Sequence, residues 1–324
     1  MLTPVAIITA FLVGFAMKYG GLCTYAAALQ IVRKRRFERL MAFLGAAAWT
    51  ALVVIPLAWR WPDSLQLSAT HDQWLMVLLG GALLGLGAYL NRGCVFGTFV
   101  QLTGGNLTYV ATLIGMVAGA VGAKYWLSDT APVKADPALA AAPGLWAAVW
   151  LLIALLVLIA VCIDFSAHGS RRRIRLRPLS GILVGLTLGV GGGWLFAAVN
   201  GWDFTAVMMR SAWHALELTP TGPTALTVYC TLAMVAGGVA AAVSHNRFSW
   251  QAPMLMPSLA SFAGGALMGV AAIILPGGND GLLLSGVPAL APHALAGFLL
   301  MLVTMVLLLT LAPNQRGFSI AGRT

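Results

Sequence analysis

The sequence predicts an all-α membrane protein with about nine transmembrane helices and four short half-helices, and three observations lead to this prediction. Of the 324 residues, 60% are hydrophobic and 9% are charged, whereas a soluble domain carries about 25% charged residues. Apolar runs of roughly 20 residues, the length at which a helix crosses a bilayer, recur along the chain. Glycine-containing breaks interrupt several of these runs. The mean hydropathy of +0.90 agrees with a chain that lies mostly in lipid.

Nine segments are apolar enough to be expected as membrane spans. They are residues 4–18, 39–59, 74–90, 107–127, 145–165, 179–199, 223–244, 257–275 and 291–312. The first, third, sixth and eighth are followed by short helical pieces, at residues 23–32, 94–103, 204–217 and 279–287. We expect each of these long segments and its short piece to make a single crossing together.

The distribution of positive charge predicts the orientation. The formal net charge of +10 comes mainly from two basic loops, which contain Arg33, Lys34, Arg35, Arg36 and Arg39 and then Arg171, Arg172, Arg173, Arg175 and Arg177. Because cytoplasmic loops are rich in Lys and Arg, this charge indicates orientation and not nucleic-acid binding. The loops 60–73 and 128–143 should lie outside. We therefore expect a multi-pass protein of the cell inner (plasma) membrane, with its N-terminus outside and its C-terminus cytoplasmic.

Short sequence matches predict an internal repeat. Gly80–Leu83 recurs 184 residues later as Gly264–Leu267, and Leu12–Gly14 recurs 171 residues later as Leu183–Gly185. A single span between the halves inverts the second one. Inverted repeats with broken helices and a site near the membrane midplane are typical of transporters. The predicted parts are a first repeat at residues 1–143, a linking span and basic loop at 144–178, and an inverted second repeat at 179–324.

Two cysteines each open a half-helix after a glycine-containing break. Residues 90–103 read LNRGCVFGTFVQLT around Cys94, and residues 19–23 read YGGLC and end at Cys23. Such breaks are costly in lipid and are tolerated where they line a cavity. A half-helix that begins there directs free N–H groups and its positive dipole end at the occupant. The pattern predicts an anion site around Gly21, Gly93 and the two thiols. The alternative is a pair of buried cysteines that act as small hydrophobic residues.

Two cations lie close to these cysteines in the sequence. Lys18 precedes Cys23 by five residues, and Arg92 precedes Cys94 by two. Intramembrane charges usually mark a transport pathway. The alternative is that either side chain reaches the interface by snorkelling. Asn91, next to Arg92, is expected to donate amide hydrogen bonds.

A further break, PGGND, occurs at residues 276–280. It adds Gly277, Gly278 and Asn279 to the candidate site, although Pro with two glycines also suits an ordinary turn. Asp280 is expected to pair with Lys18 or Arg92, or to cap the short helix that follows. The other two cysteines, Cys162 and Cys230, have no glycine break beside them and are expected to be structural.

The stretches GGLCTYAA, NRGCVFGTF and PGGNDGLLLSGVP resemble those of the YeeE/YedE family of membrane sulfur transporters, over nearly the whole chain. The resemblance implies uptake of thiosulfate along an hourglass-like path, on which cysteine thiols pass the anion by S–H hydrogen bonds. Cys23 and Cys94 would then be the relay thiols. Some relatives act with a small cytoplasmic TusA-like sulfur carrier, which makes such a carrier a candidate partner.

The chain departs from this family at one position. Thiosulfate-transporting relatives carry a third cysteine, expected just before the PGGND stretch, where this chain has Ile273, Ile274 and Leu275. The inner step of a three-thiol relay therefore has no thiol here. Asn279 or backbone N–H groups would replace it, or the substrate would be a different sulfur species.

Two other functions compete with transport. One is a membrane thiol–disulfide relay between Cys23 and Cys94, which requires Cα atoms about 4.4–6.8 Å apart. The other is a cysteine-based sulfurtransferase, but no His or carboxylate base lies near either cysteine in the sequence. We predict a transporter and not an enzyme. No metal or cofactor motif is visible, and the expected partners are a small sulfur anion and the lipid bilayer.

Overall fold

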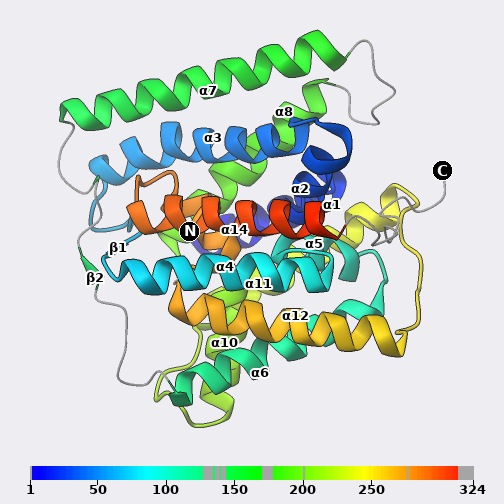
Figure 1. Ribbon diagram of the computed structural model, residues 1–324. Coiled ribbons are helices and arrows are strands. Elements are labelled where there is room, and N and C mark those ends of the chain that lie inside the picture. Colours follow the sequence, from blue (N-terminus) through cyan, green and yellow to red (C-terminus); the bar gives the residue numbers. More distant parts are fainter. Residues whose placement is uncertain are drawn as a thin grey trace.

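The computed structural model describes residues 2–126, 134–135, 139, 144–169, 178–199, 201–275 and 277–312. Most of them form helices whose long axes run in a similar direction (Figure 1). Within the described residues, nine helical segments are long and apolar enough to cross a membrane. The predicted all-α fold with about nine spans is therefore confirmed.

The helix bounds follow the predicted segments closely. The long helices are α1 (Leu2–Gly20), α3 (Glu38–Arg60), α4 (Trp74–Asn91), α6 (Val110–Trp126), α7 (Leu145–Gly169), α11 (Ala225–Ser244), α12 (Leu255–Ile274) and α14 (Pro292–Leu311). The remaining span is continuous through α8 (Pro178–Leu186), the π-helical turn η2 (Thr187–Gly191) and α9 (Gly192–Ala198).

The four predicted half-helices are also present. They are α2 (Thr24–Lys34), α5 (Val95–Leu102), α10 (Phe204–Ala215) and α13 (Gly278–Gly281), the last continued by the π-helical turn η3 (Leu282–Gly286). A 3₁₀ turn, η1 (Leu107–Tyr109), precedes α6. Two short strands, β1 (Thr70–His71) and β2 (Lys134–Ala135), pair antiparallel, with Thr70 opposite Ala135.

Helix α7 forms one edge of the bundle and packs against α3, whereas α6 and α10 lie at the opposite edge (Figure 1). The face of α7 that α3 does not cover is apolar, with Trp146 and Leu156 exposed, as expected for a helix in contact with lipid. The half-helices α2 and α5 lie between these edges. The candidate site is therefore inside the bundle.

Glycines allow the inner helices to approach closely. A Cβ atom on Gly115 or Gly119 of α6 would overlap a backbone carbonyl of α12. A Cβ on Gly14 of α1 or Gly237 of α11 would likewise overlap the backbone of the other helix of that pair. Small residues at such interfaces let helix backbones pack directly, which is how membrane helices associate. This packing fixes the long helices that carry the breaks.

Candidate functional site

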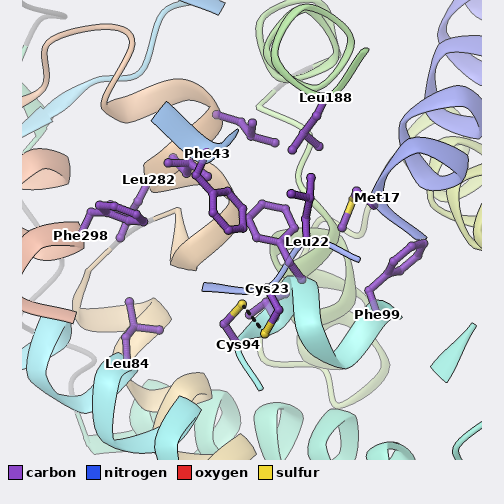
Figure 2. Packing of buried hydrophobic residues seen from close by; sticks show 14 of the residues in the cluster. Met17, Leu22, Cys23, Phe43, Leu84, Cys94, Phe99, Leu188, Leu282 and Phe298 are labelled. Atoms are coloured by element: carbon purple, nitrogen blue, oxygen red, sulfur yellow. Dashed lines mark hydrogen bonds between the residues drawn. The ribbon is translucent and has the colours of Figure 1, made fainter. Parts of the chain in front are cut away.

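The two predicted cysteines meet inside the bundle. The Sγ atom of Cys94 lies 3.8 Å from the Sγ atom of Cys23, and their side chains are 1% and 5% exposed. The backbone N–H group of Thr24 donates to the Cys94 sulfur at 3.2 Å. Figure 2 shows the two sulfurs pointing toward each other. Cysteines from two different broken helices therefore form one buried junction.

Each break contains one left-handed residue followed by extended backbone. After α1, Gly21 has φ +58°, and Cys23 is extended with φ −158°. After α4, the left-handed residue is Arg92 with φ 55°, and Cys94 is again extended, with ψ −176°. Gly21 is thus required by its backbone conformation, whereas Gly93 is not the left-handed residue of its break.

Both cysteines are the residues that directly precede the half-helices. Cys23 precedes α2, Cys94 precedes α5, and neither side chain caps the helix that follows it. The first N–H groups of a helix have no acceptor within the helix, and the helix dipole adds positive potential there. Because α2 and α5 begin at neighbouring sulfurs, their positive ends converge on one point, which suits an anion.

Asn91 holds the second break together. Its Nδ2 atom donates to the Gly93 carbonyl at 2.7 Å and to the Thr98 hydroxyl at 2.9 Å. The Thr112 hydroxyl donates to its Oδ1 atom at 2.7 Å. Both amide hydrogens are therefore used to join the end of α4 to α5, and the oxygen joins it to α6. The amide donor expected at this position serves the protein's own structure.

Gly97, on the first turn of α5, is packed against Cys23. A Cβ atom at Gly97 would overlap the Cys23 sulfur. At Gly93 the nearest atom to such a Cβ would be a ring carbon of Tyr109, 3.6 Å away, which is ordinary contact. The close approach of α5 to the first thiol thus depends on Gly97.

Arg92 lines a separate cavity of about 180 Å³, whose wall contains both polar and apolar residues. The cavity lies where α4 ends and α6 and α12 begin, and its wall includes Asn91, Tyr109 and Ser261. Arg92 is half-buried, whereas Tyr109 and Ser261 are buried. Arg92 lies two residues before Cys94 in the chain. This cavity, whose wall contains the Arg92 cation, is therefore close to the thiol junction.

Lys18 is placed at the other end of α5. Its Nζ atom donates to the Val100 carbonyl at 2.6 Å, and the side chain is buried. A cation at the C-terminal end of a helix stabilises it through the helix dipole. This contact anchors α5 to α1 and directs the Lys18 charge away from the two sulfurs.

The third break has two consecutive left-handed glycines, with φ 100° at Gly277 and φ 51° at Gly278. Asn279 is 1% exposed, and neither of its amide atoms has a hydrogen-bond partner among the described residues. Asp280 accepts from the backbone N–H and the hydroxyl of Thr205. The expected ion pair of Asp280 with Lys18 or Arg92 is therefore not formed.

The other two cysteines lie away from the junction. Cys230 is fully buried in α11, and Cys162 is half-buried in α7. The basic residues 171–177 and Pro276 lie outside the described residues.

Several contact residues were not expected from the sequence. The sequence gives no signal that Thr98 and Thr112 bond to Asn91, or that Gly97 contacts Cys23. Asp203 is different, because an Asp directly before a predicted helix is a recognisable N-cap. Its side chain accepts a hydrogen bond from the N–H group of Ala206 in α10.

Comparison with known protein families gives one match. A family model described as sulphur transport matches residues 19–307, which include both cysteines, Arg92 and the PGGND break. The comparison with curated proteins found no match.

Proposed function

Since the chain belongs to the sulphur transport family, we propose that it takes up thiosulfate or a related small sulfur anion through the Cys23–Cys94 junction. The protein is a multi-pass membrane protein of a transporter family. The observation that carries the proposal is the 3.8 Å separation of the two sulfurs at the point where two half-helices begin.

The chemistry of the junction suits transient binding of an anion more than tight binding. A thiolate would repel an anion, so the thiols act in the protonated form, in which each is a weak hydrogen-bond donor. The converging ends of α2 and α5 supply most of the attraction. A transport site must hold its ion without trapping it. Weak S–H donors combined with helix dipoles meet that requirement.

The Arg92 cavity supplies the next position on the proposed path. It lies at the end of the bundle where the backbone of Asn106 pairs with that of Gln251. Under the proposed orientation this end is cytoplasmic. An anion leaving Cys94 would then meet a guanidinium group, from which water or a TusA-like sulfur carrier in the cytoplasm would receive it.

The position of the third family cysteine is filled by apolar packing. Leu275 is fully buried and lies against Gly80 of α4 and Gly297 of α14. No thiol contributes there. We propose that the Asn279 amide takes part in place of the third thiol, because its donor and acceptor are both without partners among the described residues.

The orientation and repeat proposals have their own test. The N-terminus lies outside, and residues 1–143 and 179–324 form inverted repeats around an hourglass-like path. Single cysteines introduced at residues 35 and 173 should react with an impermeant reagent only from inside. Those at residues 67 and 134 should react only from outside. Labelling of residues 35 and 173 from opposite sides would contradict the nine-crossing topology.

Uptake of labelled thiosulfate into proteoliposomes tests the function directly. We expect saturable uptake that unlabelled thiosulfate inhibits and that sulfate, the control anion, does not. Cys230→Ala removes a buried thiol outside the junction and should leave uptake unchanged. Wild-type protein that takes up neither thiosulfate nor another small sulfur anion would contradict the proposal.

A thiol–disulfide relay is the second candidate, because the same 3.8 Å separation places the two sulfurs close enough to react after small rotations. Forming that bond would release two protons and two electrons to an acceptor in the membrane. Mass spectrometry after mild oxidation would then show a reversible Cys23–Cys94 bond, and uptake would be absent. The transport proposal predicts uptake under reducing conditions, with both thiols free.

A further inference from the structure

A second polar cluster is buried where the half-helices of the C-terminal half meet. Asp203, directly before α10, is 7% exposed, and its Oδ1 atom accepts from the Ala206 N–H group at 2.5 Å. Asp280 of α13 is 5% exposed and accepts from the Thr205 N–H group at 3.3 Å and the Thr205 hydroxyl at 2.9 Å. The two carboxylates thus bind consecutive N–H groups in the first turn of α10.

These carboxylates have polar neighbours but no paired cation. In the part of the chain that the structure describes, their hydrogen bonds come from backbone N–H groups and one hydroxyl. Arg210, on the same helix as Thr205, donates to the Ala206 carbonyl instead. Two unpaired carboxylate charges are costly to bury, and neighbouring carboxyls relieve that cost by holding a proton.

A small cavity lies between this cluster and α5, the half-helix that follows Cys94. It has a volume of about 30 Å³ and is lined by Asp203 and Asp280 on one side and by Val95, Phe96 and Phe99 of α5 on another. Most of the lining is apolar, and the volume is enough for one or two water molecules beside the two carboxyls. The carboxyls therefore share a cavity with the half-helix that begins at Cys94.

Asn279 is a further buried polar group beside the pair in the sequence, and the residues that line the cavity do not include it. It precedes Asp280 in α13, is 99% buried, and both its amide nitrogen and its amide oxygen are without partners among the described residues. A buried amide without a partner is unfavourable, and a water molecule, which donates and accepts, would satisfy it. The cavity that Asp203 and Asp280 line gives the two carboxyls a place to exchange protons with water.

We propose that Asp203 and Asp280 form a proton-binding site and that the sulfur anion moves inward together with a proton. This inference rests on the proposed function. A carboxylate charge beside α5 repels an anion at Cys94, whereas a neutral carboxyl does not, so anion and proton each favour the binding of the other. The proton binds a carboxylate oxygen and leaves to water, and no bond in the anion is broken.

The electrostatic surroundings of the pair are simple. Arg210 is the cation whose field reaches Asp203. Helices α5, α9 and α12 carry no charged residue. The other titratable groups on the same helix and on packed elements are His214 of α10, Lys18 and Tyr19 of α1, Lys124 and Tyr125 of α6, Tyr229 and Cys230 of α11, and His293 of α14.

Proteoliposomes with an internal pH indicator test this inference, with the membrane voltage held at zero. One proton per anion predicts that an acid-outside gradient of about one pH unit drives about tenfold accumulation of thiosulfate. The lumen should acidify in step with uptake. Asp203→Asn and Asp280→Asn should lose this accumulation and keep exchange of labelled for unlabelled thiosulfate. Asn caps a helix as well as Asp does, so α10 keeps its N-cap.

Asp72→Asn, which changes an exposed carboxylate in the loop before α4, is the matched control and should accumulate thiosulfate like the wild type. Thiosulfate uptake without proton movement in the wild type would overturn the inference and leave the proposed function standing. Full accumulation in both Asn variants would overturn it equally. Absence of all uptake and exchange in the wild type would instead contradict the proposed function itself. Because the wild-type measurement uses no variant, it tests the inference even if a substitution prevents folding.

Discussion

Half-helices begin at two buried junctions, and the two junctions satisfy their N–H groups differently. At α10 the protein's own carboxylates, Asp203 and Asp280, accept from consecutive N–H groups of the first turn. At α2 the acceptor is the Cys94 sulfur, 3.2 Å from the Thr24 nitrogen. A thiol sulfur accepts weakly, whereas a carboxylate accepts strongly. The carboxyl junction is therefore filled by internal groups, and we propose that the thiol junction leaves its positive potential to an exchangeable anion.

The two asparagines beside the breaks also differ, but in the reverse sense: the one at the thiol junction is satisfied within the protein, and the one at the carboxyl junction is not. Asn91 uses both amide hydrogens and its oxygen within the protein. Asn279 has partners for neither amide atom among the described residues. At the thiol junction the amide is structural, and we propose that the cysteines face the substrate. At the carboxyl junction we assign the open hydrogen-bonding capacity to Asn279.

The largest effect on uptake is expected from Gly97→Ala. The new methyl group overlaps the Cys23 sulfur, and overpacking of this kind costs about 1–3 kcal/mol. Displacing the thiol should lower thiosulfate uptake by about tenfold or more, which corresponds to about 1.4 kcal/mol. Gly93→Ala, in the same segment, has room for a methyl group and should keep uptake close to wild type. Equal uptake by the two variants would show that the sulfur–sulfur approach does not matter.

On stability, the largest effect is expected from Asn91→Ala. It removes three hydrogen bonds and takes the Asn91 partner away from the buried hydroxyl groups of Thr98 and Thr112. The free energy of unfolding should fall by about 2–4 kcal/mol. Asn279→Ala removes an amide that has no partner among the described residues, so it should leave stability unchanged while it lowers uptake. Thermal unfolding in detergent, followed by uptake assays, measures both. A large loss of stability in the Asn279 variant would contradict this contrast.

Lys18→Met should have the smallest effect. It removes the charge that donates to the Val100 carbonyl at the end of α5, which is worth about 1 kcal/mol. The substitution removes a cation from the end of α5 and leaves the two thiols in place, so thiosulfate uptake should fall by less than in Gly97→Ala. Lys124→Met, which removes a cation over the Trp213 ring far along α6, serves as the control for loss of a positive charge. Complete loss of uptake in the Lys18 variant alone would indicate direct contact with the anion.

The spans and half-helices were predictable because their signals are local. Apolar length predicted the nine spans, and glycine beside Cys23 and Cys94 predicted the first two breaks. The meeting of the two sulfurs depends on how α5 packs against α1 and α2, and no pattern within either broken segment specifies that distance. The contacts of Asn91 with Thr112 and of Asp280 with Thr205 join residues 21 and 75 positions apart. Such contacts arise from tertiary packing, which a single sequence does not display.

The structure adds contacts that sequence proximity does not indicate. Lys18 precedes Cys23 by five residues, and α1 continues to Gly20 and brings its side chain to the Val100 carbonyl near the end of α5. Asp280 was expected to pair with Lys18 or Arg92 or to cap the short helix that follows, and it accepts from the N–H group and hydroxyl of Thr205 in α10. Both contacts are made to a helix that is distant in the sequence.

The central claim, that the junction passes an anion by thiol hydrogen bonds, is tested most directly by uptake in Cys94→Ser and Cys94→Ala proteins. Both side chains fit the site, and only Ser keeps a hydroxyl that can donate to the anion and accept from Thr24. Hydrogen bonding predicts that Ser retains much of the wild-type rate and that Ala loses about tenfold or more, the effect of one hydrogen bond of about 1.4 kcal/mol. Equal loss in both variants, together with a reversible Cys23–Cys94 disulfide in the wild type, would contradict the account and favour a redox relay.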